Sequence, residues 1–223
     1  MNSVYALVVA AGRGERFGGG VPKQYLPLGG SPVLRHAVTA LAGHPGVSGV
    51  LVAIRPEDRG LFDHAVAGLR ALPPVAGGAT RQDSVRLGLE ALTAYRPRRV
   101  LIHDGARPFP DPGLVDRVID GLDRAPAAIP CLPLRDTIKR AEDGAIRATV
   151  DRSTLWRAQT PQGFHFDAIL AAHRAAADRS LTDDAAVAET AGWAPLVVAG
   201  NEDNLKVTTQ EDLATAERLL SAR

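Results

Sequence analysis

The chain of 223 residues contains a single cysteine, Cys131, and few aromatic residues. One cysteine cannot form an internal disulfide, and its apolar neighbours predict a buried structural thiol. Positive and negative side chains nearly cancel, with 26 Lys and Arg against 25 Asp and Glu. This balance argues against a partner that is bulk nucleic acid or an anionic membrane surface. Because no apolar run approaches about 18 residues, we expect a cytoplasmic protein without a signal peptide or a membrane span.

Two common glycine-loop motifs are also absent. The dinucleotide fingerprint G-x-G-x-x-G would need its third glycine at Phe17, and the chain holds no Gly-Lys-Ser/Thr of a Walker A loop. A nicotinamide-dependent dehydrogenase is therefore disfavoured. Apart from His103, which we expect to be a core or supporting residue, the histidines show no metal-ligand spacing, so no zinc site is predicted.

The most informative stretch is residues 4–25. It begins with an apolar run at 4–10, which is typical of a strand buried on both faces. A glycine-rich loop follows and carries the cations Arg13, Arg16 and Lys23. Such a loop, leaving a parallel strand, can bring backbone N–H groups close to a phosphate chain. The stretch predicts a site where a triphosphate is held and cut, although a purely structural turn is the alternative.

Patterns of strands and helices alternate along the rest of the chain. Further strands are predicted at 47–54, 75–76, 99–103, 127–132 and 196–199. Helices are predicted after a cap at Ser31, at 56–72, at 85–94, after a cap at Asp111, at 166–177, at 183–191 and after a cap at Thr209. This order predicts an α/β fold in which residues 1–223 form a single Rossmann-like three-layer domain with a mostly parallel central sheet.

Three loops of this sheet should meet at one edge, because ligands of such sheets sit beyond the carboxyl ends of the strands. The loops read AAGRGER, GGATRQDS and DGARP, and their convergence predicts a nucleotide site. Asp104 ends a predicted strand there. A carboxylate beside a triphosphate needs a cation between them, so we expect Asp104 to bind Mg²⁺. The alternative is an aspartate that caps the next turn.

A projecting β-hairpin is predicted at 136–141 and 145–150, around the turn sequence Glu142-Asp143-Gly144. Its outer residues are largely polar and charged, which is unusual for a hairpin in a core. We therefore expect residues 134–152 to form an arm that packs on another subunit.

The cations fit nucleotidyl transfer. Negative charge builds on the α-phosphate and on the departing pyrophosphate, so fixed cations such as Arg16 and Lys23 lower the barrier. A phosphate oxygen of the acceptor needs no general base to attack. It needs cations to approach another anion, and Arg107, Arg152 and Lys206 are candidates. For each of these three the alternative is a solvated surface charge.

With these residues in view, the chain resembles the 2-C-methyl-D-erythritol 4-phosphate cytidylyltransferases of the non-mevalonate isoprenoid pathway. The ordered motifs that carry the resemblance are AAGRGER, PKQYLPLGG, GGATRQDSV, HDGARP, RDTIKRA, VDR, TPQ, TDDA and DNLKVTTQEDL. The resemblance implies CTP and the methylerythritol phosphate as substrates, a Mg²⁺ requirement, release of pyrophosphate, and a homodimer joined through the hairpin arm. We also expect the chain to lack the fused cyclodiphosphate synthase domain that some family members carry.

The resemblance also assigns residues. Its catalytic residues are Arg16, Lys23, Arg152 and Lys206. Its nucleotide-binding residues are Ala10, Ala11, Gly12, Gly14, Gly78, Arg81, Ser84, Asp104 and Ala106, with Asp104 as the metal ligand. Its acceptor-binding residues are Arg107, Thr137, Arg152, Thr160 and Lys206. Thr137 and Arg152 would reach the nucleotide of the neighbouring subunit.

Two alternatives stay open. A D-ribitol-5-phosphate cytidylyltransferase shares the scaffold and the chemistry, and its acceptor is a phosphorylated polyol of similar size that the charges above cannot distinguish. A non-catalytic nucleotide sensor would bind CTP without turnover.

Overall fold

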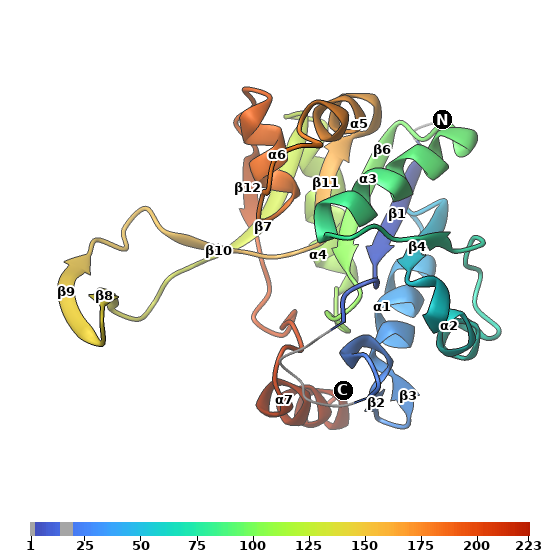
Figure 1. Ribbon diagram of the computed structural model, residues 1–223, viewed down its shortest axis with the longest axis horizontal. Coiled ribbons are helices and arrows are strands. Elements are labelled where there is room, and N and C mark those ends of the chain that lie inside the picture. Colours follow the sequence, from blue (N-terminus) through green and yellow to red (C-terminus); the bar gives the residue numbers. More distant parts are fainter. Residues whose placement is uncertain (1–2, 14–19) are drawn as a thin grey trace.

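The computed structural model describes residues 3–13 and 20–223 (Figure 1). In this part of the chain a central sheet has eight strands in the spatial order β10-β7-β11-β6-β1-β4-β5, with β12 also paired to β7. Its strands are β1 (Val4–Val9), β4 (Gly49–Ile54), β5 (Val75–Ala76), β6 (Arg99–Asp104), β7 (Ala127–Pro133), β10 (Trp156–Ala158), β11 (Gln162–His165) and β12 (Leu196–Ala199). The β1–β4, β1–β6, β4–β5 and β7–β12 pairs are parallel, as predicted for most of the sheet.

Helices and short elements surround this sheet. The helices are α1 (Val33–Ala42), α2 (Arg59–Val66), α3 (Arg81–Leu92), α4 (Pro112–Gly121), α5 (Phe166–Ala175), α6 (Asp184–Thr190) and α7 (Gln210–Ser221). Single 3-10 turns are η2 (Lys23–Tyr25), η3 (Pro56–Asp58) and η4 (Thr93–Tyr95). Two small hairpins are β2 (Pro27–Leu28) with β3 (Ser31–Pro32), and β8 (Ile138–Glu142) with β9 (Ala145–Val150). None of the helices in the described ranges is both long and apolar enough to cross a membrane.

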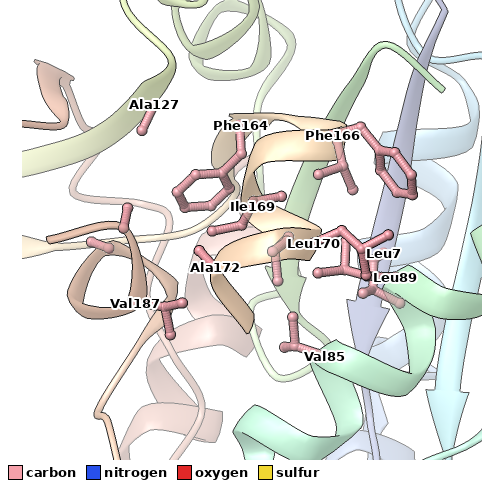
Figure 2. Packing of buried hydrophobic residues seen from close by; sticks show 14 of the residues in the cluster. Leu7, Val85, Leu89, Ala127, Phe164, Phe166, Ile169, Leu170, Ala172 and Val187 are labelled. Atoms are coloured by element: carbon pink, nitrogen blue, oxygen red, sulfur yellow. The ribbon is translucent and has the colours of Figure 1, made fainter. Parts of the chain in front are cut away.

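Alternating side chains of the strands build two hydrophobic cores, one on each face of the sheet. Leu7 packs with Val85 of α3 and Ile169 of α5 on one face (Figure 2). Its neighbours in β1, Ala6 and Val8, belong to the second core, with residues of α1, α2 and α4. Because successive strand residues point to opposite faces, a strand buried on both faces reads as a continuous apolar run. The predicted three-layer arrangement is confirmed.

The register of the sheet brings the predicted loops to one edge. Val9, the last residue of β1, pairs with Asp104 on β6 and with Ala53 on β4, and Ala53 in turn pairs with Val75 on β5. The segments that follow these parallel strands therefore leave the sheet side by side, at its carboxyl edge.

Two strands of the central sheet were not predicted. β11 runs antiparallel between β6 and β7, and β10 pairs antiparallel with β7. Each is only three or four residues long, and QGFH and WRA show neither alternation nor an apolar run. Runs this short fall below the length at which hydrophobic periodicity identifies a strand.

The helix predicted at 56–72 is shorter than expected. A 3-10 turn precedes α2, which ends at Val66, and Gly68 then takes a φ of +76° that only glycine adopts without strain. Within α2, Phe62 is buried and Leu61 is exposed. Ser31 is not a helix cap, because it pairs with Leu28 in the small hairpin and α1 begins after Pro32.

Other helix starts agree with the sequence. The Asp111 side chain accepts a hydrogen bond from the Leu114 N–H, and Thr209 forms a capping box with Asp212. The helix predicted at 85–94 begins earlier, at Arg81, because Thr80 and Asp83 form a second capping box.

The predicted hairpin is present as β8 and β9, and it projects from the body of the molecule (Figure 1). Its turn residues Asp143 and Gly144 both have positive φ, as a two-residue hairpin turn requires. The role of residues 134–152 in dimerisation stays a prediction.

Candidate active site

A cavity of about 760 Å³ opens at the carboxyl edge of the sheet. Loops that follow β1, β5 and β6 line it, together with residues of η2 and of the segment before α7. Of the predicted nucleotide-binding residues, the structure brings eight to this cavity: Ala10, Ala11, Gly12, Gly78, Arg81, Ser84, Asp104 and Ala106. Gly14 lies outside the described residues. The size suits a nucleotide-sized ligand.

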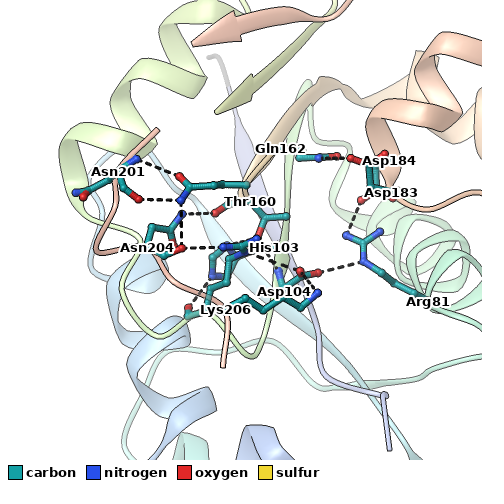
Figure 3. A network of polar contacts seen from close by, with 12 residues as sticks. Arg81, His103, Asp104, Thr160, Gln162, Asp183, Asp184, Asn201, Asn204 and Lys206 are labelled. Carbon is teal, nitrogen blue, oxygen red and sulfur yellow. Dashed lines mark hydrogen bonds and ion pairs between the residues drawn. The ribbon is translucent and has the colours of Figure 1, made fainter. Parts of the chain in front are cut away.

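Asp104 lies at the centre of a group of cations (Figure 3). Its Oδ1 atom is 3.1 Å from Arg81 Nε and its Oδ2 atom is 2.7 Å from Lys206 Nζ. Arg107 Nε is 3.9 Å from Oδ2. Burial alone would raise the pKa of Asp104, but these positive charges outweigh it and hold the pKa far below its usual range. Asp104 is therefore a carboxylate at any physiological pH.

A buried histidine fixes the backbone behind Asp104. Burial lowers the pKa of His103 to about 4, so its ring is neutral. Its Nε2 atom lies 3.0 Å from the Arg107 carbonyl oxygen and so carries the proton. Its Nδ1 atom accepts from the Thr160 hydroxyl, which in turn accepts from the Asp104 N–H (Figure 3). His103 is thus a supporting residue, as expected from its place one position before Asp104.

Close backbone approaches shape the loops. A Cβ atom on Gly77 would lie 2.4 Å from Ala11 Cβ, and one on Gly78 would lie 2.3 Å from Asp83 Cβ. The Ser84 hydroxyl accepts from the Gly78 N–H and donates to the Thr80 carbonyl, which fixes the second loop. Glycine at 77 lets the loops after β1 and β5 touch, and glycine at 78 lets the second loop pack against Asp83 at the start of α3.

The sequence reasoning missed Gln24. Its Nε2 atom donates to the Ala10 carbonyl at 2.6 Å and to the Gly12 carbonyl at 3.1 Å, so η2 holds the first loop. These contacts join segments that only the folded chain brings together. Gln24 also lies directly after Lys23, which lines the cavity.

Arg55 was missed as well, although a signal for it existed. It follows β4 directly, at the same carboxyl edge, and it lines the cavity with Arg13. Arg16, one of the predicted catalytic residues, lies outside the described residues.

The predicted acceptor-binding residues fall into three places. Lys206 lines the cavity. Arg107 and Thr160 lie behind it, where an Arg107 guanidinium nitrogen donates to the Asn204 carbonyl at 2.7 Å and Thr160 is buried. Thr137 and Arg152 are exposed at the base of the arm, outside the cavity, and Arg152 donates to the Arg135 carbonyl. Within one chain the structure does not bring these last two to the others.

The family model described as 2-C-methyl-D-erythritol 4-phosphate cytidylyltransferase (IspD) matches residues 4–222. The chain belongs to this family. It is 60% identical over 220 residues to the bifunctional enzyme IspD/IspF of Rhodospirillum rubrum. That alignment covers 98% of this chain and 57% of the relative, so the chain spans little more than half the length of this curated relative.

Two solved structures of IspD enzymes agree with this chain over nearly their whole length. The 2-C-methyl-D-erythritol 4-phosphate cytidylyltransferase of Thermus thermophilus is 35% identical, with a TM-score of 0.83 over 98% of this chain and 99% of that one. A 4-diphosphocytidyl-2C-methyl-D-erythritol synthase is 34% identical, with a TM-score of 0.87 over 99% of both chains. The resemblance read from the ordered motifs is confirmed.

The donor set of the IspD cavity bears on the expected Mg²⁺. Asp104 is the single acidic side chain among the described residues that line the cavity, and no group of three or more His, Cys, Asp or Glu suited to a metal occurs in residues 3–13 and 20–223. Mg²⁺ is commonly held by one or two carboxylates together with substrate phosphates. Asp104 Oδ1 contacts Arg81, and Oδ2 contacts Lys206 and, at 3.9 Å, Arg107, whereas a carboxylate offers about four lone-pair sites. Asp104 therefore fits a Mg²⁺ ion whose other ligands are phosphate oxygens.

Proposed function

We propose that this chain transfers CMP from CTP to 2-C-methyl-D-erythritol 4-phosphate, which yields 4-diphosphocytidyl-2-C-methyl-D-erythritol and pyrophosphate. One observation carries the proposal: a chain of the IspD family holds Lys23, Lys206 and Asp104 in one cavity that Gly12 and Gly78 also line. The relatives and solved structures named above are of the methylerythritol class, which favours that acceptor over ribitol 5-phosphate.

The proposed reaction is one displacement at phosphorus. A phosphate oxygen of the acceptor attacks the α-phosphorus of CTP and forms the new P–O bond. The bond between the α-phosphorus and the oxygen bridging to the β-phosphate breaks, and pyrophosphate leaves with the electron pair. No proton has to be removed from the nucleophile, so the cavity needs positive charge rather than a general base.

Cations of the chain supply this charge in the proposal. Lys23 and Arg16 stabilise the charge that grows on the α-phosphate and the leaving group, an interaction that is stronger in the transition state than in the ground state. Lys206 draws the acceptor phosphate toward the cavity. Asp104 holds Lys206 in place, because an ion pair at 2.7 Å restricts the long lysine side chain.

We include Mg²⁺ in the proposal, bound by Asp104 and by oxygens of the triphosphate. When bound, the ion neutralises phosphate charge and orients the triphosphate. Removal of Mg²⁺ by a chelator should abolish pyrophosphate release, and added Mg²⁺ should restore it.

The functional unit in the proposal is a homodimer joined through the arm, with Thr137 and Arg152 completing the site of the partner. Two features support it: the arm projects from the body, and Ile146 on it is 67% exposed. A second subunit packed on the arm would bury this apolar side chain. We also propose a cytoplasmic enzyme, because a lone free cysteine suits a reducing compartment.

The acceptor can be tested directly. The protein is incubated with CTP, Mg²⁺ and either 2-C-methyl-D-erythritol 4-phosphate or D-ribitol 5-phosphate, and pyrophosphate release is followed. We expect release with the methylerythritol phosphate and at least about tenfold lower kcat/KM with the ribitol phosphate, since one misfitting group costs about 1–3 kcal/mol. The reverse preference would favour the ribitol enzyme, and CTP binding without turnover on either acceptor would favour a nucleotide sensor.

A further inference from the structure

Arg81 bridges two carboxylates from different parts of the fold (Figure 3). Its Nε atom lies 3.1 Å from Asp104 Oδ1 in the cavity, and one terminal nitrogen donates to Asp184 Oδ2 at 2.8 Å. Asp184 is the first residue of α6 and does not line the cavity. We propose that Asp184 is a positioning residue, which holds the Arg81 guanidinium in the orientation that the nucleotide site requires. This inference rests on the proposed function.

Both carboxylate oxygens of Asp184 accept a hydrogen bond, and the side chain is buried. Its side chain is 1% exposed, and its other oxygen, Oδ1, lies 3.1 Å from Nε2 of the fully buried His173. Among the described residues, His173 Nδ1 has no hydrogen-bond partner, so Nε2 carries the proton and donates to the carboxylate. Each oxygen of Asp184 therefore has one donor, and a carboxylate buried in this way is stable only while its partners stay in place.

Contacts with both Asp104 and Asp184 fix the orientation of the Arg81 side chain, because its guanidinium group is planar. A planar guanidinium held at two different nitrogens is fixed in orientation, whereas one contact leaves it free to turn. Burial opposes the positive charge on Arg81, but Asp184 and Asp104 outweigh this effect and raise its pKa further. Arg81 is thus a permanent cation whose direction depends on both carboxylates.

Loss of the negative charge on Asp184 would change how the cations around Asp104 are held. Arg81, Lys206 and Arg107 all lie within 4 Å of Asp104, while Asp184 is the second anion that Arg81 contacts. Without that second anion, Arg81 would be held by Asp104 alone and would compete there with Lys206. Misplacement of a fixed cation by about 1 Å can lower a rate about a hundredfold.

The neighbouring Asp183 offers a matched control. Its side chain caps α6 by accepting from the Ala186 N–H at 3.0 Å, and it accepts from Gln162 Nε2 at 2.8 Å. Within the described residues Asp183 has no hydrogen bond or ion pair to Arg81, and it is half-buried, so it shares the charge of Asp184 but differs in partner and in burial. Asn at this position keeps the capping oxygen.

The test is a double-mutant cycle on CTP turnover with D184N, R81M and the pair, and D183N as the control. If Asp184 acts through Arg81, D184N lowers kcat/KM roughly 10–100-fold alone but less than about twofold in the R81M background, since coupled residues are not additive. D183N should stay within about twofold of the parent. Thermal unfolding of every variant shows whether it is folded.

Equal losses from D184N in both backgrounds, or a D184N enzyme as fast as the parent, would overturn the inference. If D184N does not fold, the same cycle is carried out with D184E, which keeps the buried charge beside His173. D184E should then lower kcat/KM only when Arg81 is present. If the unmutated protein shows no CTP-dependent turnover, both the proposed function and this inference are overturned. If the unmutated protein is active and the losses from the two substitutions are additive, only this inference is overturned.

Discussion

Lys206 Nζ lies 2.7 Å from Asp104 Oδ2, and this ion pair joins the end of β6 to the segment before α7. Packing holds that segment in place, because the Val207 N–H donates to the Ala106 carbonyl at 2.8 Å and the Val207 side chain is buried in a small core with α7. A cation that would otherwise be a mobile surface charge is therefore fixed in the cavity.

Replacement of Lys23 by alanine should lower kcat by roughly two to three orders of magnitude, because it removes one cation aimed at the reacting phosphates. The measurement is steady-state pyrophosphate release at saturating substrates, with the melting temperature as a check of the fold. Arg59→Ala is the control, since Arg59 is an exposed cation on α2 that pairs with Asp63. A Lys23→Ala enzyme with near-parental turnover would contradict the assigned role.

Replacement of Gly78 by alanine should weaken CTP binding and destabilise the fold by about 1–3 kcal/mol. The reason is steric, since the new Cβ would lie 2.3 Å from Asp83 Cβ. Calorimetric CTP titration and urea unfolding would measure the two effects. Gly60→Ala is the matched control, because a Cβ on Gly60 meets nothing within 4 Å. Equal behaviour of the two variants would show that the loop is not tightly packed.

Mixing two inactive variants should restore activity if the site is shared between subunits. In a dimer of one Lys23→Ala subunit and one Arg152→Ala subunit, one site would combine an intact cavity with an intact arm. Half of randomly exchanged dimers are mixed and each has one good site, so about a quarter of the parental activity should return. Subunits are exchanged by dilution and reconcentration, and sedimentation confirms the dimer. Mixtures that stay inactive while exchange is complete would place Arg152 outside the partner's site.

The thiol of Cys131 should be unreactive in the folded protein. Burial, together with the charge of Asp183, raises its pKa to about 11, so the neutral thiol persists at about pH 8–9. A thiol with a pKa near 11, rather than the usual pKa near 9, has a thiolate fraction that is lower by about a hundredfold. Reaction with a thiol-specific dye at about pH 8.5, with and without urea, should be much slower for the native protein. Equal rates would show that Cys131 is accessible.

The edge of the sheet that forms the site was predictable from the sequence. Ala10, Gly78 and Asp104 each follow a strand pattern, and in a parallel sheet such positions meet at one edge. Arg55 obeys the same rule and could have been found with it.

Other features depend on contacts that local patterns do not encode. Gln24 reaches back to the Ala10 and Gly12 carbonyls, and Asp184 reaches Arg81 from a helix far along the chain. β11 is inserted between strands that precede it, through only four residues. In each case partners distant in the sequence decide the role, so no periodicity or spacing reports it.

The most direct test of the central claim is a crystal structure of the protein with CTP and Mg²⁺ bound. We predict the triphosphate in the cavity at the carboxyl edge of the sheet, with Lys23 on its phosphates and Asp104 on the metal ion. A triphosphate bound elsewhere, with Lys23 and Asp104 remote from it, would contradict the account.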